Sequence, residues 1–236
     1  MFDFEKINKD KSFNYTPAPK GTHEARLIKL IDLGTHEFSY KGDKKLIREL
    51  YMGFELPLQL MENDEGRKIP MFVSKKVNLI FSEKSALRQM VESWLGEKFK
   101  NQQTANKFKI TSLVGKSALV TIVHDYNERS GRTYAKIESV SAAPASTKVP
   151  AQVNDSVILS LDPKSFNDKV FKEEIHNVHQ DRIKESPEYE ALKKAKLGED
   201  EELESEPEPV KRPKNKEKSN SVDADLQKIM DDDSWD

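Results

Sequence analysis

The chain has 236 residues, of which 34% are charged and 36% hydrophobic, a composition too polar for every segment to belong to a packed core. It contains no cysteine, which excludes disulfide bonds, thiolate metal sites and a cysteine nucleophile. Residues 1–150 carry 25 Lys and Arg against 18 Asp and Glu, whereas residues 151–236 carry 14 against 23, so the net charge of −2 conceals a division. A basic body followed by an acidic tail is typical of a protein that binds a polyanion.

The predicted elements begin after an arm of residues 1–21. The start of the chain lacks the pattern of a signal peptide, and no apolar run approaches the ~20 residues of a membrane span, so we expect a cytoplasmic protein without membrane contact. An apolar run within residues 22–34 predicts the first strand. Residues 34–45 are polar, contain two glycines and predict a loop.

Alternating apolar residues predict a second strand over residues 46–56, which Pro57 ends. Its core face should hold Leu46, Leu50, Met52, Phe54 and Leu56, and its other face, with Tyr51 and Glu55, should be wet. A third strand is predicted over residues 70–81, in which Phe72 is expected in the core, as is the later Phe108.

A helix is predicted between Ser82, its expected N-cap, and Gly96, which should end it, because apolar residues from Ala86 to Leu95 recur at helical spacing. Two further strands are predicted over residues 117–124 and 132–141. This order predicts a mainly β fold: a five-stranded OB-fold barrel over residues 22–145 with one helix between strands 3 and 4.

The C-terminal part is predicted as a linker and helical extension over residues 146–197, followed by a disordered acidic tail over residues 198–236. The linker contains one apolar patch at residues 157–159, and Ser186 and Pro187 are typical of a helix start. Two roles remain open for the extension: docking on the barrel, or self-association into a homo-oligomer.

Histidines are the residues that would most readily support catalysis or metal binding in this chain. His176 and His179 follow Glu173 at spacings that place side chains on one helix face, which suits a metal. A carboxylate-bridged site needs a second such motif, which the sequence lacks, so we interpret both histidines as structural. We predict no catalytic residue, no metal and no cofactor.

Aromatic and basic residues alternate in the two loops that border the binding face of an OB-fold. The first loop and strand 2 supply Phe38, Tyr40, Lys41, Lys44, Lys45, Arg48 and Tyr51, of which Arg48 has the parity of the core face. The last hairpin supplies Tyr126, Arg129, Arg132, Tyr134 and Lys136. Single-stranded nucleic acid needs aromatic rings on which bases stack and cations along its phosphates. These residues therefore predict a site for single-stranded DNA.

The chain ends in a group of acidic residues around one indole ring: Asp231, Asp232, Asp233, Trp235 and Asp236. This ending is similar to the C-terminal peptide of bacterial and phage single-stranded DNA-binding proteins, which recruits other proteins. The bacterial peptide ends in Pro-Phe, whereas this chain ends in Trp-Asp. The difference bears on which partner proteins the tail would recruit.

Four blocks in the body resemble a family of phage-encoded single-stranded DNA-binding proteins: residues 21–27 (GTHEARL), 31–35 (IDLGT), 53–57 (GFELP) and 113–116 (LVGK). Residues 186–189 (SPEY) resemble it too. The resemblance implies a non-enzymatic OB-fold protein that coats single strands in phage DNA replication and recombination, with partner proteins bound through the acidic tail. It implies nothing about individual DNA contacts.

Two other functions fit the same residues. An RNA-binding OB module would use the aromatic and basic loops equally well. A factor that binds a host protein through the barrel and the tail would have no affinity for nucleic acid. An enzyme with a metal at His176 and His179 is a more distant alternative.

Overall fold

An antiparallel sheet dominates the structure, a computed structural model that describes residues 16–40 and 42–204, with only the backbone for Tyr40 and residues 196–204. Its strands are β1 (Gly21–Tyr40), β2 (Asp43–Glu62), β3 (Lys68–Asn78), β4 (Ser117–Asn127), β5 (Arg132–Ser141) and β6 (Val157–Leu159). They lie in the order β3-β2-β1-β4-β5, and β6 pairs in parallel with β1. The prediction of a mainly β fold is confirmed. The predicted bounds of β5 agree with the structure, whereas β6 was expected only as an apolar patch.

The first two strands form one long hairpin, so the predicted loop over residues 34–45 is wrong. The pairing of β1 with β2 runs from Arg26 opposite Glu55 to Tyr40 opposite Asp43. Gly42 takes the left-handed conformation at the turn, with φ of 91°. Polar residues are tolerated here because a two-stranded ribbon exposes both of its faces.

The expected end of β2 at Pro57 is also wrong. β2 continues to Glu62, with an irregularity in its pairing with β3 between Leu56 and Leu60. By this point β1 has left β2 and pairs with β4, so one edge of β2 is free among the described residues. A proline, which lacks an N–H, is accommodated at such an edge or bulge.

The inner face of the sheet packs against α2 (Ala86–Leu95) in a hydrophobic core. Ser85, not the predicted Ser82, is the N-cap, because its side chain accepts the Arg88 N–H at 3.4 Å. Gly96 ends the helix with φ of 73°, as predicted. Trp94 is buried in this core, and its indole N–H donates to the Ser117 carbonyl at 2.7 Å. Two short elements that were not predicted follow: α3 (Gln102–Asn106) and η1 (Ile110–Leu113).

The described sheet is not closed into a barrel, in contrast to the prediction. No strand pairing joins β3 to β5, the two ends of the strand order, among the described residues. A side chain bridges them instead, because Lys75 Nζ on β3 donates to the carbonyls of Ile137 at 3.0 Å and Glu138 at 3.2 Å on β5. Burial lowers the pKa of Lys75.

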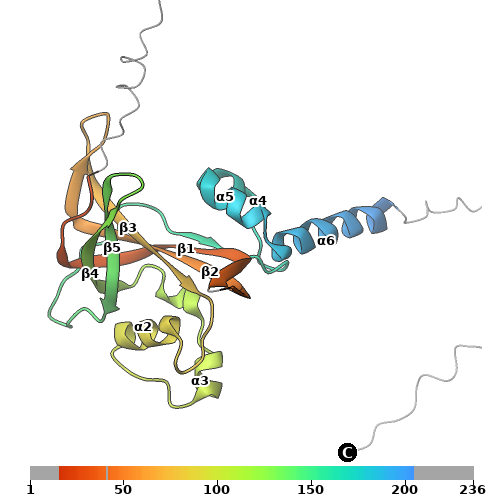
Figure 1. Ribbon diagram of the computed structural model, residues 1–236, viewed down its shortest axis with the longest axis horizontal. Coiled ribbons are helices and arrows are strands. Elements are labelled where there is room, and N and C mark those ends of the chain that lie inside the picture. The colour runs from red at the N-terminus through yellow and green to blue at the C-terminus, as the bar shows by residue number, and fades with distance from the viewer. Residues whose placement is uncertain (1–15, 41, 205–236) are drawn as a thin grey trace, which may run out of the picture. The chain divides into compact units, whose positions relative to one another are not determined.

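The outward face of β1 and β2 is covered in part by β6 and by α4 (Asp168–Glu173), α5 (Asn177–Lys184) and the start of α6 (Pro187–Glu204). Figure 1 shows α4 and α5 on the opposite side of the sheet from α2 and α3. A second core lies here, formed by Ile31, Leu33, Val157, Leu159, Leu161, Phe171, Ile175, Ile183 and Leu192. The sheet and this extension belong to one compact unit that ends at Gly198. No described helix is both long and apolar enough to cross a membrane.

Two polar side chains of the sheet hold the segment that leads into β6. Glu55 was expected on a wet face but is fully buried, and its carboxylate accepts the backbone N–H groups of Val153 at 2.7 Å and Asn154 at 2.9 Å. The Arg26 guanidinium donates to the carbonyls of Val149 and Gly115 at 2.8 Å. Residues that follow the sheet in sequence are therefore fixed to it by buried hydrogen bonds.

The start of α6 is fixed to β1 by Glu188. Its carboxylate accepts the Thr35 N–H at 2.9 Å and the Thr35 hydroxyl at 2.5 Å. Burial raises the pKa of Glu188, but these hydrogen bonds and the nearby Arg48 outweigh it and hold the pKa below its ordinary value. Gly34 permits the contact, since a Cβ there would lie 2.3 Å from Ser186 Cβ. As predicted, Pro187 is the first residue of this helix.

Candidate nucleic-acid interface

The two predicted binding hairpins lie at opposite ends of the sheet. Gly21 pairs with Ile122, so the β4–β5 hairpin extends past the N-terminal end of β1. The β1–β2 hairpin extends past the C-terminal end of β1. Figure 1 shows the two hairpin ends well apart. The face of β1, β2 and β3 that points away from α2, called the outward face below, lies between them.

The register decides which residues of the first hairpin share that face, because residues directly opposite each other in a ladder point to the same side. Ile31 belongs to the second core and pairs with Tyr51, so both lie on the outward face. Lys45 has the same parity as Tyr51 in β2 and pairs with Phe38, so these two residues share that face. Lys44 points to the other side and forms an ion pair with Glu37 at 2.8 Å. Phe38 is exposed and lines a small pocket with Arg182 of α5.

Arg48 and Tyr51, both predicted DNA contacts, are engaged within the protein. Arg48 donates to both carboxylate oxygens of the buried Asp32, at 3.1 and 2.5 Å, and these bonds raise the pKa of Arg48. The Tyr51 ring lies against His179 of α5, with centroids 4.4 Å apart. Tyr51 is half-buried, and this burial raises the pKa of its hydroxyl. Arg48 therefore stabilises the fold, and Tyr51 packs against α5 at the edge of the outward face.

Phe72 of β3 is an exposed aromatic residue of the outward face, although it was expected in the core. Its side chain is 40% exposed. The ring lies directly on the backbone of Gly53, where a Cβ would be 2.2 Å from Phe72 Cζ. Gly53 is therefore required for this ring to lie on the sheet. Gly53 and Phe72 were both visible in the sequence, but the pairing of β2 with β3, which sets Ser74 opposite Gly53 and Phe72 diagonally across from it, was not.

One lysine lies beside this ring, and a second lies further along β3. Lys29 Nζ lies 5.7 Å from the centroid of Phe72, a cation–π distance, and Lys29 pairs directly with Gly53. Lys76 is exposed, follows Phe72 by four residues on β3 and pairs directly with Tyr51. Neither lysine forms an ion pair with any described residue. The outward face thus presents an exposed aromatic ring and two lysines that no described carboxylate neutralises.

The β4–β5 hairpin carries exposed aromatic rings and mixed charge. Tyr126 and Tyr134 are both exposed, and the Tyr134 hydroxyl lies 3.1 Å from the Ser130 hydroxyl. Lys136 forms an ion pair with Asp125 at 3.5 Å. Arg129 and Arg132 are exposed as well. The hairpin fits a peripheral contact better than a central one, because its charges are partly compensated.

Several predicted site residues lie outside the described part of the structure. They are the side chain of Tyr40, the whole of Lys41, and the tail residues Asp231, Asp232, Asp233, Trp235 and Asp236.

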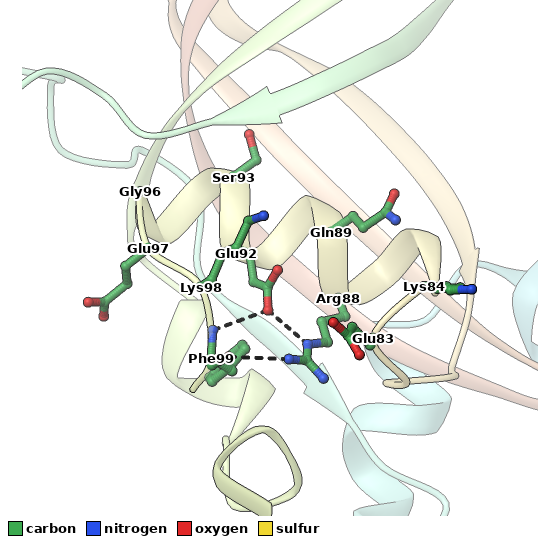
Figure 2. Close-up of a pocket in the computed structure, with 10 residues that line it drawn as sticks. All are labelled: Glu83, Lys84, Arg88, Gln89, Glu92, Ser93, Gly96, Glu97, Lys98 and Phe99. Carbon is green, nitrogen blue, oxygen red and sulfur yellow. Dashed lines mark hydrogen bonds and ion pairs between the residues drawn. The ribbon is translucent and has the colours of Figure 1, made fainter. Parts of the chain in front are cut away.

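A widely open cavity of about 780 Å³ lies beside α2 (Figure 2). Its floor is Arg88, whose Nε donates to Glu92 at 2.8 Å and whose other nitrogens donate to Gln102 and the Phe99 carbonyl. Glu92 also accepts the Phe99 N–H at 3.1 Å. The hydrogen bond from Arg88 is the main reason that the pKa of Glu92 is lowered. These groups hold the loop between α2 and α3 and are satisfied by one another.

The two histidines of the extension have separate structural environments. His176 is the N-cap of α5 and accepts the Val178 N–H at 3.3 Å, whereas His179 contacts Tyr51. The described residues contain no group of three or more His, Asp or Glu that could hold a metal ion.

No protein-family model matches the chain, and no curated protein is similar to it in sequence.

Proposed function

We propose that the protein binds single-stranded DNA, without enzymatic activity and largely without regard to sequence. The observation that supports this most strongly is the exposed Phe72 ring on Gly53, on the same face as Lys29 and Lys76, which have no ionic partner among the described residues. Stacking of a base on such a ring contributes about 1–3 kcal/mol and works for every base, since each has a π face. Neighbouring lysines supply charge for the phosphates on either side.

An exposed ring on the surface of a sheet favours a single strand over a duplex. In a duplex both faces of a base are already stacked on neighbouring bases, so the ring would find no free face. Phe38 at one end of the outward face, and Tyr126 and Tyr134 on the opposite hairpin, offer further rings along a strand that crosses it. Single-strand binding surfaces combine such rings with a basic track.

The sheet supports an OB-fold as part of this proposal. The order β3-β2-β1-β4-β5 with a helix between β3 and β4 is the order that an OB-fold would have. OB-folds are partly open barrels that bind oligonucleotides on strands 2 and 3. The seam between β3 and β5, bridged by Lys75, would be the open part.

The biological setting is proposed from the sequence alone. The resemblance of residues 21–27, 31–35, 53–57 and 113–116 to phage single-stranded DNA-binding proteins suggests a role in phage DNA replication and recombination in the cytoplasm of a bacterial host. The acidic tail would then recruit replication or recombination proteins, with Trp235 as the anchor.

The test is fluorescence anisotropy of a labelled oligo-dT, a duplex of equal length and an oligo-U, across a salt series. We expect tight and salt-sensitive binding of oligo-dT and little binding of the duplex. Phe72→Ala should weaken oligo-dT binding by about tenfold or more, the stacking contribution of one base. Leu58→Ala is the matched control, because Leu58 is an apolar side chain that is 57% exposed on a different part of β2.

Other outcomes would replace the proposal. Stronger binding of oligo-U would indicate an RNA-binding module. No binding of any oligonucleotide at low salt would indicate a protein-binding role for this face. Equal effects of Phe72→Ala and Leu58→Ala would refute the stacking role of Phe72.

A further inference from the structure

His179 is held in a fixed position at the edge of the outward face. Its ring contacts the Tyr51 ring at 4.4 Å with an interplanar angle of 53°. α5, which carries it, begins at the His176 N-cap and is tied to the preceding turn by Gln180, whose side-chain amide donates to the Ile175 carbonyl at 2.8 Å. The imidazole therefore stays beside the sheet and is only half-buried.

The charged groups around His179 are all basic. Lys29 on β1, Lys76 on β3 and His176 on α5 act on it electrostatically, and Tyr51 on β2 is neutral at physiological pH. Glu49, the acidic residue of β2 that is nearest to Tyr51 in sequence, is already paired with Arg182 at 3.2 Å. Three elements thus direct positive charge at one half-buried imidazole, and no carboxylate among the described residues balances it.

Burial is the main cause that lowers the pKa of His179, and electrostatic interactions with His176, Lys76 and Lys29 lower it further. The imidazole is therefore harder to protonate in the free protein than a histidine in water. An anion bound among these groups would reverse the electrostatic part of this effect, since negative charge favours the protonated form.

We infer that a backbone phosphate of the bound strand docks against Lys29, Lys76 and His179, and that His179 takes up a proton from solvent as it docks. This inference rests on the proposed single-strand binding. The phosphodiester stays intact and the proton moves only to the imidazole. The strand would then run along β3 from this phosphate position to the Phe72 ring.

Linkage fixes the direction of the pH effects. Because phosphate raises the pKa of His179, affinity for single-stranded DNA should increase as pH falls from 8 to 5.5, by up to about tenfold for each pKa unit gained. The stability of the free protein should change in the opposite direction. The pKa of His179 is lower in the folded than in the unfolded protein. The contribution of His179 to stability is therefore lost as pH falls below about 6.5.

The experiment measures oligo-dT binding by anisotropy between pH 5.5 and 8 at fixed salt, for wild type, His179→Gln, His179→Lys and His23→Gln. We expect the affinity of wild type to rise on acidification. The affinity of H179Q should be weak and nearly independent of pH, and that of H179K strong and equally independent. His23 is remote on β1 and bonded to the Pro19 carbonyl, so H23Q should follow wild type.

A second readout separates failure of this inference from failure of the proposed function. The His179 pKa is followed by NMR in the full chain, alone and with inorganic phosphate or oligo-dT. Tight oligo-dT binding with the same pH slope in wild type and H179Q would overturn the inference and leave the function standing. A rise in the His179 pKa with inorganic phosphate, without any oligonucleotide binding, would support the anion site and refute the function. No change with either ligand would overturn the anion site.

Discussion

The cavity beside α2 and the outward face of β1, β2 and β3 both contain charged and aromatic residues, but they differ in whether the charged groups are paired. In the cavity, Arg88 is almost fully buried and bonded to Glu92, Gln102 and the Phe99 carbonyl. On the outward face, Lys29 lies beside the exposed Phe72 ring and Lys76 lies further along β3, and neither has a carboxylate partner among the described residues. Arg88 and Glu92 of the cavity are paired with one another, whereas these lysines of the outward face are paired with no described residue.

If the outward face binds DNA as proposed, unbalanced charge is a better guide to the binding surface of this protein than cavity volume. A buried charge must find partners within the fold, because its desolvation is costly. A charge on an open sheet remains hydrated at little cost and can exchange water for a ligand. Replacing residues in the two regions should therefore have separable effects: on stability for the cavity, and on DNA affinity for the outward face.

The largest effect on stability is expected for Arg88→Ala. Removing the guanidinium leaves Glu92 without its cation and the Phe99 carbonyl without a donor, which should lower the free energy of unfolding by about 3 kcal/mol. Urea denaturation measures this. Lys84→Ala on the exposed rim of the same cavity is the control and should change it by less than about 0.5 kcal/mol. Unchanged stability of R88A would contradict the structural role of the cavity.

An intermediate effect is expected for Gly53→Ala. The new methyl group would meet the Phe72 ring and force it off the sheet. Oligo-dT affinity should fall about five- to tenfold, less than the full stacking contribution because the displaced ring can still reach some bases. In a Phe72→Ala background the same change should have no further effect on affinity. Additive losses in the double variant would mean that Gly53 acts independently of the ring.

The smallest effect on stability is expected for the double variant Lys29→Ala, Lys76→Ala, because neither side chain has an ionic partner to lose within the described part of the chain. The free energy of unfolding should stay within about 0.5 kcal/mol of wild type. The slope of log affinity against log salt should fall by about 1.4, or about 0.7 for each phosphate contact removed from a single strand. The charge-matched control is Lys84→Ala, Lys107→Ala, for which we expect an unchanged slope.

Local signals in the sequence predicted the elements that depend on local physics. The α2 helix follows from apolar spacing and its Gly96 end, and β5 from a run of strand-forming residues after a polar turn. The strand character of residues 34–45 was missed because a ribbon exposed on both faces needs no apolar alternation. β6 was missed because three residues become a strand only when β1 supplies a free edge.

The candidate site was predicted in part. Register places Phe38, Lys45 and Tyr51 on the outward face, but Tyr51 is engaged by α5, a helix more than 120 residues later in the chain. Phe72 was assigned to the core because an apolar residue in a strand is usually buried. Its exposure depends on where the extension stops covering the sheet. Such long-range coverage leaves no periodic signal in sequence.

The contact between Thr35 and Glu188 spans 153 residues, and this separation has a consequence for the order of events during synthesis. β1 leaves the ribosome with Ile31 and Leu33 on a face whose covering residues, from Val157 to Leu192, are translated more than 120 residues later. Until then that apolar surface stays open to other proteins, including a second nascent chain. Chaperone occupancy should therefore be highest in the interval between completion of β5 and the arrival of α6.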